Sequence, residues 1–147
     1  MNTRIPAQPQ ALRPEDLALI ETARQTITRL YTENRHHIGS AARSRSGKVY
    51  TAVHLDTYVG RASVCAEAIA IGKAFAEADR EIELIVSVRH PRPREANREI
   101  QIVSPCGICR ELLSDFAREC DVIIPVDGGA ARVPISYLLP NKYFRQT

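Results

Sequence analysis

The feature that most constrains this chain is a pair of short cysteine-bearing segments that lie far apart in the sequence. The first is Cys65–Glu67, and the second is Pro105–Arg110, which carries Cys106 and Cys109. Each segment opens a stretch with helical spacing of apolar residues, so cysteines are expected at the starts of two helices. Thiolates are preferred zinc ligands, and a fold that uses all three must bring the two helix starts together.

The size and composition of the chain fit a globular protein. Its 147 residues, 44% of them hydrophobic, suit a single domain over residues 14–147. Residues 1–13 are polar and proline-bearing, and we expect a flexible N-terminal arm without a secretory signal. No apolar run approaches the roughly 20 residues that span a bilayer. We therefore expect a cytoplasmic protein without a membrane partner, in which the cysteines serve as ligands, catalytic groups or core residues.

The order of predicted elements indicates an α/β fold. Helices are expected at Pro14–Tyr31, at Ser63–Asp79 with Ser63 as the N-cap, and at Pro105–Glu119. Extended segments are expected at Ile38–Arg45 and Lys48–Leu55 as a hairpin, and at Glu81–Val88, Glu99–Val103 and Asp121–Val126. A turn at Asp127–Gly129 and a short helical element at Pro134–Leu139 complete the chain. This order predicts a mixed sheet with two helices on one face.

The number of thiolates distinguishes a catalytic from a structural zinc site. Structural sites use four protein ligands, whereas catalytic sites use three and leave one position for water. Cys65, Cys106 and Cys109 supply three, and Cys120, roughly 16 Å further along the predicted helix, is expected to be a core thiol. Glu67 can then reach the water without binding the metal. A structural zinc site and a redox-active cysteine pair are the alternatives.

Arg110 directly follows the cysteine pair. Three thiolates and one Zn²⁺ leave a net negative charge. Arg110 is therefore a candidate to offset that charge.

These motifs together resemble the cytidine deaminase family of the small, tetrameric, three-cysteine zinc type, and within it the blasticidin-S deaminase-like members. The zinc nucleobase deaminases share a cysteine pair and a glutamate that is not a ligand. The matching segments are Ser40–Ala42 with Gly47, Cys65–Glu67, Ser104–Arg110, and Leu138–Pro140 followed by Tyr143. The resemblance extends from about Glu15 to Phe144.

The resemblance implies a fold, a cofactor and a reaction. The fold would be a cytidine deaminase-like α/β/α sandwich with a mixed sheet of about five strands, assembled as a homotetramer with one Zn²⁺ per subunit. The reaction would be hydrolytic deamination of a free cytosine nucleoside, with Glu67 transferring the proton. Ala66 and Ser104 would contact the base.

Two further positions depart from the family pattern and bear on the substrate. His54 and Asp56 occupy the positions where the family carries an Asn and a Glu that bind the ribose. Ala68 replaces a frequent Arg, and His36 or His37 falls where an aromatic base contact is usual. These differences favour a modified cytosine nucleoside, such as an antibiotic. His54 could also be an ordinary strand histidine.

Two surface features remain open to more than one interpretation. Tyr143 matches a position where the family supplies an aromatic side chain from a neighbouring subunit, although C-terminal packing explains it equally well. Arg89–Arg98 carries four arginines against one glutamate. This loop is either a solvated surface or a rim that attracts an anionic substrate.

Two other function classes are alternatives to a nucleoside deaminase. One is a nucleic-acid-binding or editing module with a deaminase fold, and the other is a catalytically silent, zinc-stabilised interaction protein. A net charge of +3 and few aromatic residues argue against a nucleic-acid partner. Glu67 argues against a silent protein.

Overall fold

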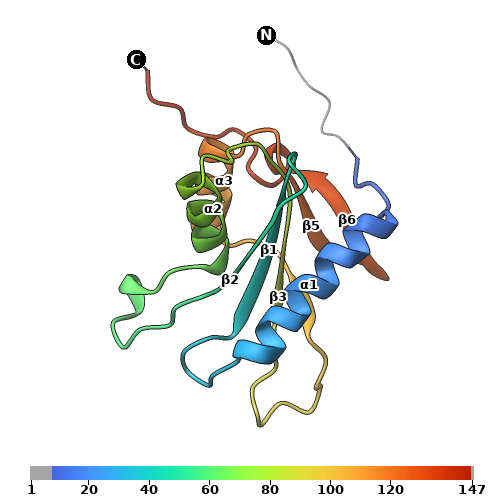
Figure 1. The fold of residues 1–147 in the computed structure, drawn as a ribbon, viewed down its shortest axis with the longest axis vertical. Helices are drawn as coiled ribbons and strands as arrows, with labels where there is room; N and C mark the ends of the chain where they lie inside the picture. Colours follow the sequence, from blue (N-terminus) through green and yellow to red (C-terminus); the bar gives the residue numbers. More distant parts are fainter. Residues whose placement is uncertain (1–7, 147) are drawn as a thin grey trace.

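A mixed sheet forms the centre of the computed structural model, which describes residues 8–146 (Figure 1). The strands run in the order β2-β1-β3-β5-β6. Their bounds are β1 Ile38–Ser44, β2 Val49–Val53, β3 Ile82–Arg89, β4 Gln101–Val103, β5 Asp121–Val126 and β6 Gly129–Pro134. β4 and β5 share one edge of β3, because β1 pairs along the whole opposite edge. Among the six described strands, only the β3–β5 pairing is parallel, so the expected mixed sheet is confirmed.

Helices cover both faces of this sheet. α1, Pro14–Leu30, packs on one face, and α2, Ala66–Ala76, and α3, Gly107–Phe116, pack on the other. The side chains of β3 alternate between the two layers: Leu84 and Val86 face α1, whereas Ile85 faces α2 and α3. Burial on both faces explains why β3 is a continuous apolar run in the sequence. The α/β/α sandwich is thus confirmed.

A close approach of α1 to β1 fixes how this helix lies on the sheet. A Cβ atom at Gly39 would lie 2.9 Å from Cβ of Ile27. Only glycine lets the helix and strand come this near.

A buried carboxylate ties the start of α1 to the sheet. Asp16 is fully buried and accepts a hydrogen bond from the backbone N–H of Arg13 at 3.0 Å. Its other oxygen lies 3.4 Å from Arg43 of β1 and 3.3 Å from Arg132 of β6. Arg132 also contacts Asp121 at 2.6 Å. One ionic network therefore joins four elements, α1, β1, β5 and β6.

The N-terminal arm expected over residues 1–13 lies partly outside the described residues, which begin at residue 8. Within the described part, Gln10 exchanges two backbone hydrogen bonds with Arg132 of β6. This part of the chain therefore lies against the edge of the sheet.

Two expected boundaries are wrong. Ser63 does not cap α2, because Cys65 is the N-cap residue and the Ser63 hydroxyl instead accepts a hydrogen bond from the N–H of Thr57. α3 ends at Phe116, so Cys120 lies in the connection to β5 and not on the helix. The expectation that Cys120 is a core thiol is confirmed by its full burial.

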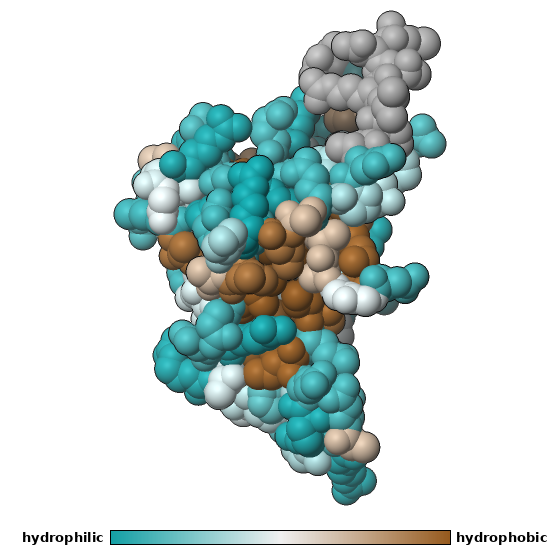
Figure 2. Space-filling model, turned by 90° about the vertical axis from the view of Figure 1, so that its right-hand side faces the viewer, coloured by the Kyte–Doolittle hydropathy of each residue, from teal (hydrophilic) through white to brown (hydrophobic). Residues whose placement is uncertain are grey.

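Part of the α1 side of the sheet remains open. Figure 2 faces the side that carries α1 and β6 and shows hydrophobic residues between hydrophilic ones. A groove of about 970 Å³ there is lined both by apolar and by polar side chains: Leu12, Leu17, Ile20, Ile100 and Ile102 on the one hand, and Glu21, Arg24, Glu99 and Gln101 on the other. Among the described helices, none has the length and apolar character needed to cross a membrane.

Candidate metal centre and active site

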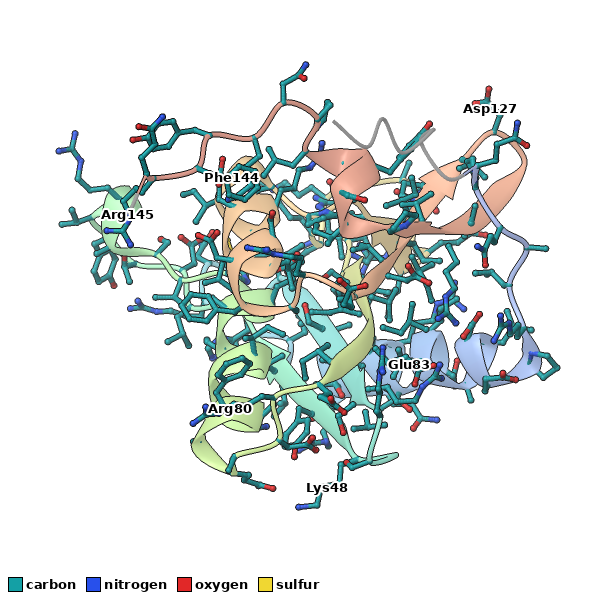
Figure 3. All side chains as sticks on the ribbon, turned by 90° about the horizontal axis from the view of Figure 1, so that it is seen from above. Lys48, Arg80, Glu83, Asp127, Phe144 and Arg145 are labelled. Atoms are coloured by element: carbon teal, nitrogen blue, oxygen red, sulfur yellow. The ribbon has the colours of Figure 1, made fainter. Side chains whose placement is uncertain are left out.

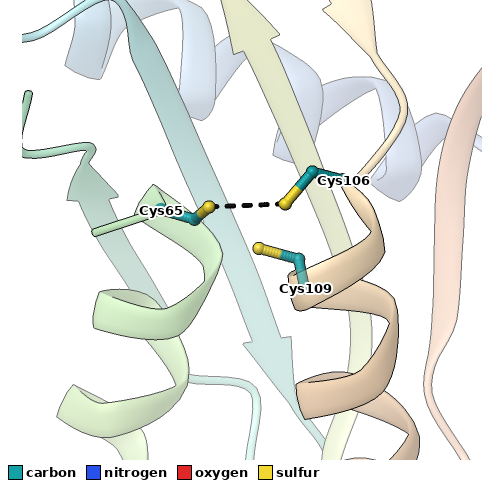
Figure 4. A group of neighbouring side chains, drawn as sticks. All are labelled: Cys65, Cys106 and Cys109. Atoms are coloured by element: carbon teal, nitrogen blue, oxygen red, sulfur yellow. Dashed lines mark hydrogen bonds between the residues drawn. The ribbon is translucent and has the colours of Figure 1, made fainter. Parts of the chain in front are cut away.

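The starts of α2 and α3 meet at one end of the sheet. Cys65 is the N-cap residue of α2, Cys106 is the N-cap residue of α3, and Cys109 lies in the first turn of α3 (Figure 4). Backbone N–H groups at a helix start are unpaired and carry partial positive charge, which favours thiolates. The two helices thus place three thiols where the helix dipoles act against the effect of burial, which disfavours the ionised form.

The spacing of the three sulfurs fits a zinc ion. All three Sγ atoms lie within 4.8 Å of one another, and those of Cys65 and Cys106 are 3.5 Å apart. Three sulfurs bound to one zinc at about 2.3 Å in a tetrahedral arrangement lie about 3.8 Å apart. The cysteines are free thiols. Within residues 8–146 no fourth His, Cys, Asp or Glu joins the group, so one position stays open for water or substrate.

The three thiols do not share one environment. Burial raises the pKa of Cys65 and of Cys109, and the nearby Glu67 carboxylate raises that of Cys109 further. At Cys106 burial also acts to raise the pKa, but hydrogen bonding to the backbone of Cys109 brings it below the ordinary value. Three thiolates so close together, beside a carboxylate, repel one another, and a bound divalent cation removes that repulsion. The donor set therefore fits Zn²⁺.

A cavity of about 260 Å³ opens beside the cysteines and holds the predicted catalytic carboxylate. Glu67, in the first turn of α2, is only 5% exposed. It is the one carboxylate among the lining residues, which are Ile38, His54, Ser63, Val64, Cys65, Ala66, Glu67, Val103, Ser104 and Cys106. A carboxylate and an open zinc position thus face the same small space.

His54 enters this cavity with its protonation fixed by the backbone. Its Nδ1 lies 2.9 Å from the N–H of His37 and 3.2 Å from the N–H of Ile38, so it accepts both hydrogen bonds. Burial first, and the neighbouring His37, lower the pKa of His54. The proton of the neutral ring must then be on Nε2. His54 is therefore a hydrogen-bond donor and cannot ligate zinc through that nitrogen.

The structure brings together most, but not all, of the residues expected to contact substrate. His54, Ala66 and Ser104 line the cavity, whereas Asp56 and Tyr143 are not among its lining residues. Asp56 accepts a hydrogen bond from Ser63 at 3.3 Å, and Tyr143 is 79% exposed.

The sequence did not predict four further residues that line the cavity. Ile38, Ser63, Val64 and Val103 line the cavity because they directly flank a strand end or a cysteine helix. Their positions next to His37, Cys65 and Ser104 are the only signal that the sequence holds for them. His37 itself is buried and accepts a hydrogen bond from the N–H of Asn34 at 2.9 Å.

Glu95 holds together the arginine-rich segment Arg89–Arg98 of the loop between β3 and β4. Glu95 receives hydrogen bonds from both terminal nitrogens of Arg89, at 3.1 and 2.6 Å, and from the N–H of Arg92 at 2.8 Å. The Arg89 hydrogen bonds lower the pKa of Glu95 to about 2. Arg92, Arg94 and Arg98 remain exposed. The loop begins beside the cavity wall, since the N–H of His90 donates to the carbonyl of His37.

An open three-thiolate zinc site with a buried carboxylate that is not a ligand, on this α/β/α sandwich, defines the class of zinc-dependent hydrolytic deaminases. Comparison with known proteins supports the same class. The family described as the cytidine and deoxycytidylate deaminase zinc-binding region matches residues 13–124. The chain belongs to this family, and the expected zinc cofactor and deaminase activity are confirmed.

One curated relative is blasticidin-S deaminase of Bacillus cereus, 48% identical over 131 residues, which cover 89% of this chain and 94% of the relative. Solved structures share the fold. The cytidine deaminase of Bacillus anthracis has a TM-score of 0.72, with 24% identity over 86% of this chain and 88% of that one. The cytidine deaminase of Burkholderia pseudomallei has a TM-score of 0.69 with 22% identity over 90% of this chain and 100% of that one.

Proposed function

We propose that this enzyme deaminates a free cytosine nucleoside of the blasticidin S type to its uracil form, with release of ammonia. The observation that carries the proposal is the 260 Å³ cavity in which Glu67 and the open side of the cysteine site face each other. The 48% identity to blasticidin-S deaminase of Bacillus cereus supports the antibiotic as substrate.

The residues of the cavity account for each requirement of the reaction. Zinc supplies a nucleophile at neutral pH, because it lowers the pKa of water. Glu67 takes the proton from the attacking water and transfers it to the ring nitrogen N3. It then takes the remaining proton of the new C4 hydroxyl and gives it to the amine, which leaves as ammonia while C4 becomes a carbonyl. Backbone groups of Ala66 and Ser104, which line the cavity, hold the polar edge of the base in this proposal. His54 donates its Nε2 proton to an acceptor on the sugar.

The environment of Glu67 suits this proton transfer. Its burial keeps bulk water from competing for the proton. Its place two residues after Cys65, in the first turn of α2, keeps it close to the metal without using it as a ligand. Because both residues belong to the start of α2, the helix fixes the position of the Glu67 carboxylate relative to the Cys65 sulfur.

A substrate panel tests the proposal. The purified zinc enzyme is incubated with blasticidin S, cytidine, deoxycytidine, CMP and single-stranded DNA, and ammonia release and the ultraviolet change are followed. We expect turnover of blasticidin S with the highest kcat/KM and no reaction with DNA. Absence of ammonia from every nucleoside would contradict the proposal, and turnover of DNA alone would favour an editing enzyme.

We also propose that the enzyme works as a homotetramer in the cytoplasm. Exposed aromatic side chains support assembly: Tyr143 and Phe144 are 79% and 58% exposed. Tyr143 could then reach the cavity of a neighbouring subunit. A reducing compartment keeps the three thiols available for zinc. Light scattering on the purified protein measures the assembly, and a monomer at micromolar concentration would contradict it.

A further inference from the structure

The side chain of Arg110 connects two segments of backbone beside the metal centre. Its Nε donates a hydrogen bond to the carbonyl of Pro105 at 2.9 Å, and its Nη1 donates to the carbonyl of Leu138 at 3.1 Å. Leu138 ends the short 3₁₀ helix Ile135–Leu138, which leads into the C-terminal tail. The guanidinium is therefore engaged with two carbonyls and half-buried between α3 and this helix.

Cys106 is the thiol that most needs such support. It is exposed, whereas Cys109 is buried and Cys65 is intermediate. The residue before it, Pro105, has no N–H with which to anchor the loop from β4. The backbone N–H of Arg110 bonds to the carbonyl of Cys106 at 2.9 Å, while its side chain holds the carbonyl of Pro105. One residue thus fixes the peptide groups on both sides of the Cys106 Cα.

We propose that Arg110 is a positioning residue of the zinc site, which acts by holding the Pro105 and Leu138 carbonyls and so fixing where the Cys106 sulfur lies. This differs from the sequence-based expectation that Arg110 serves as a positive charge beside the thiolates. A guanidinium presents several N–H groups in one rigid plane, whereas an ammonium is a single point of charge on a flexible stem. Only arginine can hold both carbonyls at once in this geometry.

The C-terminal tail has a second, independent attachment that provides a matched control. Lys142 contacts Glu111 and, at 3.2 Å, Asp115, both on the outer side of α3. The tail lies near the end of α3 there, because the guanidinium of Arg118 is 5.8 Å from the ring centroid of Phe144, which Figure 3 labels. Removing Lys142 loosens the tail without touching Pro105 or Cys106. The two attachments separate an effect on the metal site from a general loosening of the tail.

The test measures zinc affinity on the whole protein, without substrate. Arg110→Lys, Arg110→Met and Lys142→Met are purified as zinc proteins, and apparent zinc affinity is obtained by competition with a chromogenic chelator. Partners that orient metal ligands typically contribute about 10–100-fold in metal affinity. We expect a loss in that range for both Arg110 variants, with Lys no better than Met, and wild-type affinity for Lys142→Met.

Circular dichroism of each variant with bound zinc establishes that it is folded. If Arg110→Met does not fold, the zinc affinity of Arg110→Lys alone tests the proposal, because lysine keeps the charge and most of the aliphatic stem. Wild-type affinity in Arg110→Lys would overturn the proposal, because charge would then suffice. An equal loss in Lys142→Met would also overturn it, because docking of the tail would then be the cause. Neither outcome depends on the substrate, so the proposed reaction is tested separately.

Discussion

Glu67 and the three cysteines have separable roles at the level of single side chains. The cysteine sulfurs form the metal cluster, and Glu67 is the one carboxylate that lines the adjoining cavity. A carboxylate that transfers protons but does not bind the metal can be replaced without loss of the metal. Substitution of Glu67 therefore separates an effect on catalysis from an effect on zinc binding.

We expect Glu67→Gln to retain zinc and to lose turnover by about 10²–10⁴-fold, the usual contribution of a general acid–base group. The amide keeps the shape of the side chain but cannot accept the proton. Steady-state kinetics and zinc content measured on the same preparation check this. A kcat near that of the wild type would remove Glu67 from the mechanism.

The His54 ring has two functions that different substitutions separate. Nδ1 accepts the backbone N–H groups of His37 and Ile38, and Nε2 is left as a donor. We expect His54→Asn to keep an acceptor for the backbone and so to preserve stability. KM should rise about 2- to 10-fold, because the shorter amide cannot place an N–H where Nε2 donates. His54→Phe should raise KM similarly and, in addition, lose about 1–3 kcal/mol of stability, because two N–H groups become unpaired.

Kinetics and chemical denaturation of both His54 variants measure the two effects. If both variants bind substrate as well as the wild type does, His54 is an ordinary strand histidine, which was the alternative from the sequence.

At the level of secondary structure, the loop between β3 and β4 is the element whose role is least defined. Glu95 holds its shape through Arg89, while Arg92, Arg94 and Arg98 remain exposed. We expect replacement of these three by Gln to raise KM for an anionic substrate, with kcat unchanged, and to weaken the dependence of KM on salt. KM for uncharged cytidine, measured on the same variant, is the control. An unchanged KM for the anionic substrate would identify the loop as solvated surface.

The sequence predicted the helices and most strands because their apolar periodicity is strong, and it predicted the cysteine site because the spacing of the ligands is specific. It did not predict β6, whose residues Gly129–Pro134 include glycine, alanine and proline and have weak strand propensity. That strand forms because its backbone pairs along β5 and because Val133 enters the core. The protonation of His54 could not be predicted either, since it depends on the orientation of the backbone N–H groups of His37 and Ile38 at the start of the neighbouring strand β1.

In the molecule as a whole, Asp16 connects the start of α1 to the sheet through buried ionic contacts. It is fully buried and joins the N-terminus of α1 to Arg43 of β1 and Arg132 of β6. Removing one partner of a buried ionic network leaves the others uncompensated, at a cost of about 3–5 kcal/mol. Arg43 and Arg132 retain contacts with Glu83, and Arg132 also retains Asp121, so the lower end of this range is expected for Asp16→Ala.

Chemical denaturation of the zinc-bound protein, followed by circular dichroism, measures this loss for Asp16→Ala. Glu15→Ala is the matched control, because Glu15 is acidic, exposed and in the same first turn of α1. It should change stability by about 0.3–1 kcal/mol, the usual effect of one charge at a helix end. Equal effects of the two substitutions would mean that Asp16 acts through the helix dipole alone. A much larger effect of Asp16→Ala would show that the buried network couples α1 to β1 and β6.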